Sequence, residues 1–373
     1  MWWSSRSEVK LVKALGILFV VSLYATVLKA FPSNTRYGYA SCQSCHLSPT
    51  GGGVLTAYGR MSAEEFLSTW SSEGESRFLH AFNTPKAILI GGDIRRIGYT
   101  ASGKEGNQSD SFLMQADLEL ALRLTPSLFV VPSAGVYGKE QKTESRRHYI
   151  LLNLSDNMSF RVGKFFPAYG IMFPDHTLIT RDGMGFDEGR ESYNVEISAK
   201  GDAGELFITG VLGQKGILRE TSTEEVASTE VPKGFIVRSA AYLAKRSQLG
   251  ISGFYLSTGN SYSMAFGTYG LFGITRDVYL LFEGDKKYIS KNSDLSDYKE
   301  TTLGLAQLGY EIFKGMHVVG TAEYQNEDSS ASKISGGLQW YPRPHFEASF
   351  TLSRQTVAYE NTDSSVLLLH YYF

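Results

Sequence analysis

From about residue 86 onwards, apolar and polar residues alternate with a period of two, as they do in β-strands whose two faces differ. In the stretch 112–124 one face carries Phe112, Met114, Ala116, Leu118, Leu120, Leu122 and Leu124. The opposite face carries Gln115, Asp117, Glu119 and Arg123. A soluble sandwich would bury the apolar face in a core, whereas a transmembrane barrel exposes it to lipid and turns the charges toward a wet lumen.

The same alternation recurs near 194–200, 278–285, 317–324 and 346–353. Short turns are expected near 125–127, 156–157, 201–202, 246–247, 275–276, 314–315 and 342–344. Longer polar loops are expected near 103–110, 140–146, 166–190, 215–232, 258–261, 288–298, 326–331 and 358–363. Seven short turns and eight longer loops predict an all-β fold, an antiparallel barrel of about 16 strands. The alternative is a secreted array of β-sandwiches.

Composition agrees with a membrane barrel. Charged residues make up 20% and aromatic residues 13% of the chain, with 38 glycines, which suits many turns and aromatic girdles. The low overall hydropathy argues against a bundle of membrane helices. At the end of the chain, Leu367, Leu369, Tyr371 and Phe373 share one strand face, and a terminal aromatic there resembles the C-terminal signature of bacterial outer-membrane proteins.

Residues 1–30 have the features of a signal peptide. Arg6, Lys10 and Lys13 precede the apolar stretch 14–25, and Ala30 ends a plausible cleavage site. The alternative is an uncleaved anchor. Cleavage removes four cationic residues and one glutamate, which takes the formal net charge from −2 to about −5. A mildly acidic, exported protein gives no indication of nucleic-acid binding.

Cys42, Cys45 and His46 form a C-x-x-C-H motif, the attachment signal of c-type haem. Two thiols at this spacing can form thioethers with the haem vinyl groups, and the adjacent histidine becomes the proximal iron ligand. These are the only two cysteines of the chain. The chain therefore divides into a signal peptide (1–30), a monohaem c-type cytochrome segment (31–85) and an outer-membrane barrel (86–373).

The cytochrome segment should contain one helix, started by a capping box of Ser62 and Glu65 and ending near Gly74. About 55 residues are too few to bury a core alone. A covalent haem would supply apolar mass, and lodging the segment in the barrel lumen would complete the core. We therefore expect it on the periplasmic or lumen side of the barrel.

The sixth iron ligand stays open at this point. Met61 is a candidate, and its thioether would raise the reduction potential of the haem relative to a second histidine ligand. Its side chain could instead pack on Phe66. His80, a barrel histidine or an open site are the alternatives. Arg60 could pair with a haem propionate or lie in solvent.

The long loop 166–190 also has two interpretations. Folded inward, it would bring Asp175, His176, Arg181 and Asp182 to the lumen near the haem. Otherwise it is a solvated outer loop.

The haem-plus-barrel layout resembles the fused cytochrome–porins of the bacterial outer membrane, best known from iron oxidisers. The matching residues are Arg36, Gly38, Cys42, Cys45, His46, Pro49, Leu55, Tyr58, Gly59 and Arg60. Two departures are the inserted Gly51-Gly52-Gly53 and one missing residue between Arg36 and Gly38. The resemblance implies one haem c in an outer-membrane barrel that passes electrons between periplasmic carriers and an extracellular donor or acceptor, with Fe(II) as a candidate.

Two other classes of function are consistent with the sequence. One is a passive porin with a haem-bearing plug. The other is an outer-membrane haem peroxidase, which needs an open iron site and a distal acid–base group such as His176. The sequence contains no Walker loop, zinc signature or nucleophile elbow.

Overall fold

A computed structural model describes residues 32–38, 41–76, 85, 87–104, 106–173, 175, 177–186, 189–213, 232–258, 261–290, 298–327 and 329–373. The predicted signal peptide and two histidines considered above, His80 and His176, lie outside the described residues.

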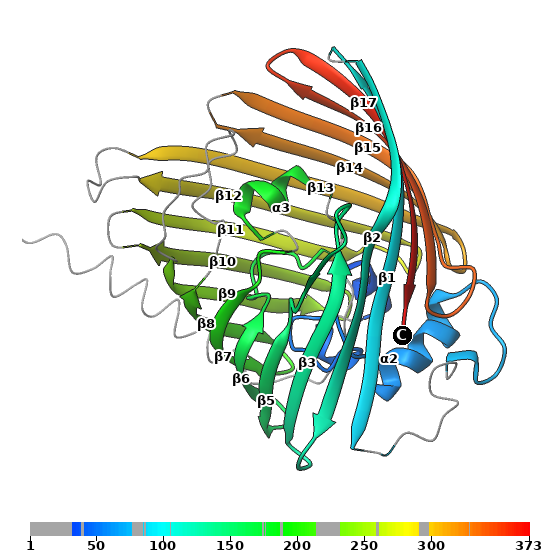
Figure 1. Ribbon diagram of the computed structural model, residues 1–373, viewed down its shortest axis with the longest axis vertical. Helices are drawn as coiled ribbons and strands as arrows, with labels where there is room; N and C mark the ends of the chain where they lie inside the picture. Colours follow the sequence, from blue (N-terminus) through cyan, green and yellow to red (C-terminus); the bar gives the residue numbers. More distant parts are fainter. Residues whose placement is uncertain are drawn as a thin grey trace, which may run out of the picture.

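The fold is a closed antiparallel β-barrel (Figure 1). Its strands are β1 (Ile88–Gly103), β2 (Gly106–Arg123), β3 (Leu128–Tyr137), β4 (Lys142–Glu144), β5 (His148–Ser155), β6 (Met158–Phe165), β7 (Ser192–Lys200), β8 (Gly204–Gly213), β9 (Lys233–Ala244), β10 (Ser247–Ser257), β11 (Tyr262–Gly273), β12 (Val278–Ser290), β13 (Lys299–Phe313), β14 (Met316–Asn326), β15 (Ser330–Trp340), β16 (Phe346–Val357) and β17 (Glu360–Tyr372). The helical segments are η1 (Pro32–Tyr37), η2 (Cys42–Ser44), α2 (Ala57–Ser62), η3 (Ala63–Leu67) and α3 (Ile179–Met184).

Pairing of β17 with β1 closes the sheet. The short β4 and the following β5 both pair with β3, at different heights, so they share one position in the wall. The barrel therefore has 16 strand positions, which confirms the predicted architecture.

Side chains alternate across the wall as predicted. Leu118 is 46% exposed on the outside, while its neighbour Glu119 is 1% exposed inside. The same contrast holds for Ile197 and Glu196, at 39% and 1%. Large apolar side chains are exposed along most of the strands, and an apolar outer surface is what lipid requires.

Two assignments in the stretch 112–124, those of Met114 and Phe112, are wrong. Met114, expected on the outer face, lines the lumen. The register between β1 and β2 shifts at Arg95/Arg96, where Met114 has no opposite residue. Such a bulge inserts one residue and exchanges the two faces beyond it. Phe112 accordingly pairs with Ile97, which also lines the lumen.

Two predicted long loops are also wrong. Only two residues separate β1 from β2, and the polar stretch 106–110 belongs to β2. Only Ala358 and Tyr359 separate β16 from β17, and their φ angles of 47° and 71° are those of a tight hairpin turn. Near the rim of the barrel, polar residues belong to the strands. A prediction from polarity alone therefore overestimates the length of the loops.

The helix of the N-terminal segment begins earlier than expected. Thr56 is its cap and accepts a hydrogen bond from Gly59 N at 3.1 Å. Ser62 lies within the helical run, with helical φ and ψ, and its hydroxyl donates to Tyr58 O at 2.8 Å. The run ends at Leu67 rather than near Gly74. None of the helices in the described part of the chain is long and apolar enough to cross a membrane.

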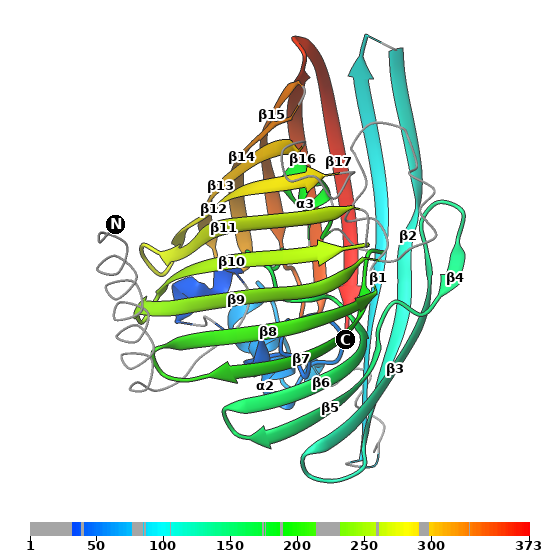
Figure 2. The same cartoon turned by 90° about the vertical axis from the view of Figure 1, so that its left-hand side faces the viewer.

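The long loop between β6 and β7 folds inward and carries α3 inside the barrel (Figures 1 and 2). Thr180 N donates to Glu323 Oε2 at 3.2 Å, and Lys287 Nζ donates to Gly183 O at 2.7 Å. Of the two interpretations of the loop, the structure therefore has the inward one. Strands β12 and β14 hold it across the lumen.

The outer surface generates a stability prediction. Ile334 and Ser335 are neighbours on β15, with the first 70% exposed outside and the second 9% exposed inside. Ile334→Arg should lower the free energy of unfolding from lipid vesicles by about 2–4 kcal/mol, because it places a cation against hydrocarbon. Ser335→Arg, the matched control, should cost less in the same denaturant titration. Equal losses would contradict a lipid-facing outer surface.

Candidate functional site: the C-x-x-C-H loop in the lumen

The C-x-x-C-H motif forms a tight loop. Cys45 N and His46 N both donate to Cys42 O, at 3.2 and 3.0 Å. The following chain turns back and pairs with it, since Leu47 N donates to Val54 O at 2.9 Å and Thr56 N to Cys45 O at 2.8 Å. These bonds fix the backbone on both sides of the two cysteines and the histidine.

The glycine insertion lies directly against this loop. Gly51, Gly52 and Gly53 all have positive φ, at 84°, 70° and 61°, which favours glycine at each position. A Cβ on Gly51 would lie 3.3 Å from Cys42 Sγ and 3.9 Å from the Cδ2 atom of His46. The absence of that methyl group leaves open the space beside the thiol and the imidazole.

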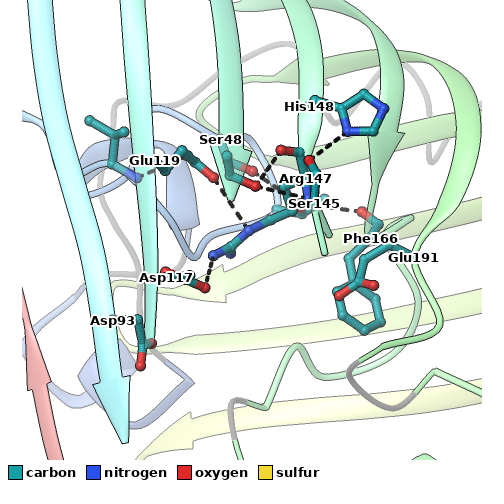
Figure 3. A network of polar contacts seen from close by, with 12 residues as sticks. Ser48, Asp93, Asp117, Glu119, Ser145, Arg147, His148, Phe166 and Glu191 are labelled. Atoms are coloured by element: carbon teal, nitrogen blue, oxygen red, sulfur yellow. Dashed lines mark hydrogen bonds and ion pairs between the residues drawn. The ribbon is translucent and has the colours of Figure 1, made fainter. Parts of the chain in front are cut away.

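Glu119 and Arg147 lie against the three glycines and attach them to the barrel wall. Figure 3 shows Arg147 in contact with both Glu119 and Asp117. Val54 N donates to Glu119 Oε1 at 3.1 Å, and Arg147 Nε lies 3.3 Å from Glu119 Oε2. Arg147 also contacts Asp117, with Nη2 3.5 Å from Oδ2. A Cβ on Gly52 would meet the Arg147 guanidinium at 2.6 Å. The insertion is thus shaped to the side chains of β2 and of the chain before β5.

Arg161 on β6 makes a second attachment. Its Nη1 donates to Ser48 Oγ at 2.9 Å, and its Nη2 lies 2.7 Å from Glu196 Oε1. Arg161 and Glu196 are each 1% exposed. The guanidinium stacks over Phe165, 3.6 Å from the ring centroid. A fully buried arginine thereby connects the loop after His46 to β6 and β7.

The first residues of the segment make a third attachment, at the end of the barrel where the short turns lie. Arg36 Nη1 lies 2.5 Å from Glu311 Oε2, and the two side chains are 1% and 7% exposed. Tyr37 OH donates to the same carboxylate at 2.9 Å, and Thr35 Oγ1 donates to Arg246 O at 3.0 Å. Further along, Thr69 N donates to Tyr341 O at 2.8 Å. The segment therefore lies inside the short-turn end.

Cys42 and His46 line a lumen cavity of about 290 Å³. Gly51, Gly52 and Gly53 line it from the same side, and Met172 and Phe173 line it from the inward loop. Strands β1, β2 and β12–β17 supply the wall. Asp175 also lines the cavity, while Arg181 is used within the loop, where Nη1 donates to Ile171 O at 3.0 Å. Asp182 pairs with Arg190 at 2.9 Å. The loop thus contributes Asp175, but not Asp182 or Arg181, to the cavity wall.

Burial inside the barrel sets the protonation of the motif. It lowers the pKa of His46 to about 4 and raises the pKa of the Cys42 thiol to about 12. The imidazole is therefore neutral near pH 7, which is the form that binds a metal. Cys45 is 5% exposed beneath the loop and is not among the cavity-lining residues.

Arg60 and Met61, the other two predicted site residues, lie elsewhere. Arg60 Nη1 donates to Leu55 O at 2.7 Å, so its guanidinium braces the chain that pairs with the motif. Burial lowers its pKa. Met61 is 52% exposed on α2 and does not line the cavity. The structure thus brings together Cys42 and His46, and leaves Met61 away from them.

Two of the three groups that a c-type haem would use, the Cys42 thiol and the His46 imidazole, line the cavity. A thiol, a neutral imidazole and a glycine without a side chain lie side by side on one cavity wall. No group of three or more His, Cys, Asp or Glu side chains in the described part of the chain is arranged to hold a metal ion. Glu119, Arg147, Arg161 and Met172 were not predicted from sequence, because the strand pattern indicates that polar side chains face inward but not which of them meet the segment.

No protein-family model matches the chain, and a search of curated proteins also finds no match. Solved structures do match. A loop-deletion mutant of OmpT, an outer membrane protein of Vibrio cholerae, is 10% identical with a TM-score of 0.60, covering 77% of this chain and 99% of that chain. An anion-selective porin from Comamonas acidovorans is 10% identical with a TM-score of 0.57, covering 77% and 99%. OprB of Pseudomonas putida is 7% identical with a TM-score of 0.56, covering 83% and 99%.

At these identities the likeness establishes the fold. The chain has the barrel fold of these outer-membrane proteins.

The buried ion pair at the barrel end can be tested directly. Arg36→Ala should weaken docking of the N-terminal segment by about 3–5 kcal/mol, because it leaves the Glu311 carboxylate buried without its cation. Amide exchange across 41–76 should rise. The control is Arg343→Ala, which removes an exposed pair with Glu75 (3.2 Å) and should cost no more than about 1 kcal/mol. Unchanged exchange in Arg36→Ala would show that this pair does not hold the segment.

Proposed function

We propose that this protein is an outer-membrane electron-transfer barrel that carries one covalent haem c in its lumen. It links periplasmic electron carriers to an extracellular donor or acceptor, with Fe(II) the first donor to test. The observation that carries the proposal is the C-x-x-C-H loop held inside a porin-type barrel, with Cys42 and His46 on the wall of the lumen cavity. The apolar outer surface supports a position in the membrane.

Cys42 and Cys45 would hold the haem through thioethers, and His46 would be the proximal ligand. When bound, the haem supplies one-electron exchange between ferrous and ferric iron. The protein's own residues do the rest. The backbone bonds to Cys42 O and Cys45 O hold the histidine in place, and the glycine run leaves room beside it. Leu55, Leu178 and Leu281 contribute apolar surface to the cavity and reduce the access of water.

The position within the barrel matters for the range of electron transfer. The hydrocarbon layer is about 30 Å thick, so a haem outside one mouth could not serve the other side. Attachments to β2, β6 and the short turns support a position inside the barrel. Partners on both sides would then approach the same site.

A passive porin with a haem-bearing plug is the second candidate, and the porin fold favours it. Against a wide channel stand the two occupants of the lumen, the N-terminal segment and the inward loop with α3. A peroxidase has less support. Of the histidines that line the cavity within the described residues, His370 is held between two carboxylates, 3.2 Å from Asp93 and 3.0 Å from Glu347. This imidazole already has two carboxylate partners, and His176, the acid–base group considered from the sequence, lies outside the described residues.

Covalent attachment is tested by changing both cysteines. Cys42→Ala combined with Cys45→Ala should abolish haem staining on a denaturing gel, because no thioether can form. The barrel should still assemble, as judged by heat-dependent mobility. Ser44→Ala, within the same loop, is the control and should keep the stain. A double variant that remains stained would refute the assignment of these thiols.

An assay in liposomes distinguishes an electron-transfer protein from a passive pore. With an oxidant enclosed and an impermeant reductant outside, the proposal predicts oxidation of the external reductant without solute leakage. The cysteine double variant should show neither electron flow nor the haem spectrum. Solute leakage without electron flow would favour the passive porin, and peroxide turnover would favour the enzyme.

A further inference from the structure

Besides His46, three methionine or histidine side chains of the described residues line the cavity, and both side-chain types serve as axial ligands in cytochromes c. They are Met114, Met172 and His370. Met61, the ligand expected from sequence, is half exposed and outside the cavity. The position of the inward loop distinguishes among these four residues.

The first part of the inward loop lies against the chain that follows the C-x-x-C-H motif. Thr50 Oγ1, four residues beyond His46, donates to Phe166 O at 3.5 Å. Arg238 Nε, on β9, donates to Gly170 O at 2.9 Å. The first part of the loop thus contacts the chain that follows His46, and β9 holds it at Gly170, two residues before Met172.

The backbone next to Met172 is held rigidly. Gly170 N donates to Ser252 Oγ and Ile171 N to Glu283 Oε2, both at 2.9 Å. Gly170 has a φ of +52°, and a Cβ there would collide with the Glu283 carboxylate. The Ile171 side chain is 1% exposed and belongs to one cluster with Tyr279 and Leu281 of β12. Because its neighbour is anchored in the wall, Met172 has a fixed starting point from which its flexible thioether reaches into the cavity.

The other candidates are less suitable. His370 is committed to Asp93 and Glu347, as described above. Met114 stands at the bulge of β2, five residues from Glu119, which holds the glycine run. At about 3.3 Å per residue, five residues place Met114 roughly 17 Å along β2 from Glu119.

We propose that Met172 is the distal ligand of the haem iron, opposite His46. This inference rests on the proposed function. A thioether ligand from the inward loop would raise the reduction potential relative to a second histidine. It would also couple that loop to the redox centre, since the same loop reaches β12 and β14.

The test uses the full-length, membrane-inserted protein and three single variants. Met172→Leu should lose the methionine-to-iron charge-transfer absorption of the ferric state and the shifted methionine methyl resonance of the ferrous state. Its midpoint potential should fall. Met61→Leu and Met114→Leu, the matched controls, should keep all three signals. Met172→His should remain six-coordinate and low-spin at a potential below that of the unmodified protein, which shows that position 172 reaches the iron.

The outcomes separate the two claims. A haem-stained Met172→Leu protein with an unchanged spectrum overturns Met172 as the ligand and leaves the proposed function standing. The same holds if Met61→Leu or Met114→Leu loses the methionine signals instead, or if the unmodified protein lacks them. An unmodified protein without any covalent haem overturns both claims.

Discussion

The structure depends on one electrostatic constraint, namely that charges on the inner wall of the barrel must find partners within it. Arg161, Glu196, Glu119 and Glu311 are almost completely buried, and an unpaired charge in such a place is costly. The N-terminal segment supplies partners through Ser48, Val54 N and Arg36. The N-terminal segment in turn is too short to bury a core of its own. The segment therefore supplies partners for the charges of the wall, and the wall buries the segment.

The fold was predictable where the sequence pattern is strictly periodic. Alternation across strands such as β7 and β14 determines which side faces lipid, and the turns between them give the number of strand positions. The errors arise where local rules compete. A bulge at Met114 exchanges faces without any marker in the sequence, and polar rim residues such as those of 106–110 look like loop. Ser62 and Glu65 match a capping box, but Thr56 starts the helix first.

The candidate site, like the fold, was predictable from the sequence only in part. The C-x-x-C-H motif is local and visible in the sequence. Its supports, Glu119, Arg147 and Arg161, come from β2, β6 and the chain before β5, and only the closed barrel brings them to the loop. Met172 could have been considered because the loop 166–190 is unusually long, but only the hydrogen bonds of Gly170 and Ile171 show where it enters the lumen. The glycine insertion, a departure from the cytochrome–porin pattern, has a structural reason in its contacts with Arg147 and Glu119.

These features together describe a porin-type barrel whose lumen holds the N-terminal segment and the inward loop, and our proposal places a redox site between them. The central claim is that the mature chain carries one haem bonded to the peptide around Cys42 and Cys45. The most direct measurement is mass spectrometry of the protein purified from outer membranes, intact and after proteolysis. The account predicts a mass increase of one haem, located on the peptide that contains both cysteines. A mature chain of unmodified mass, isolated from cells that assemble other c-type cytochromes normally, would contradict it.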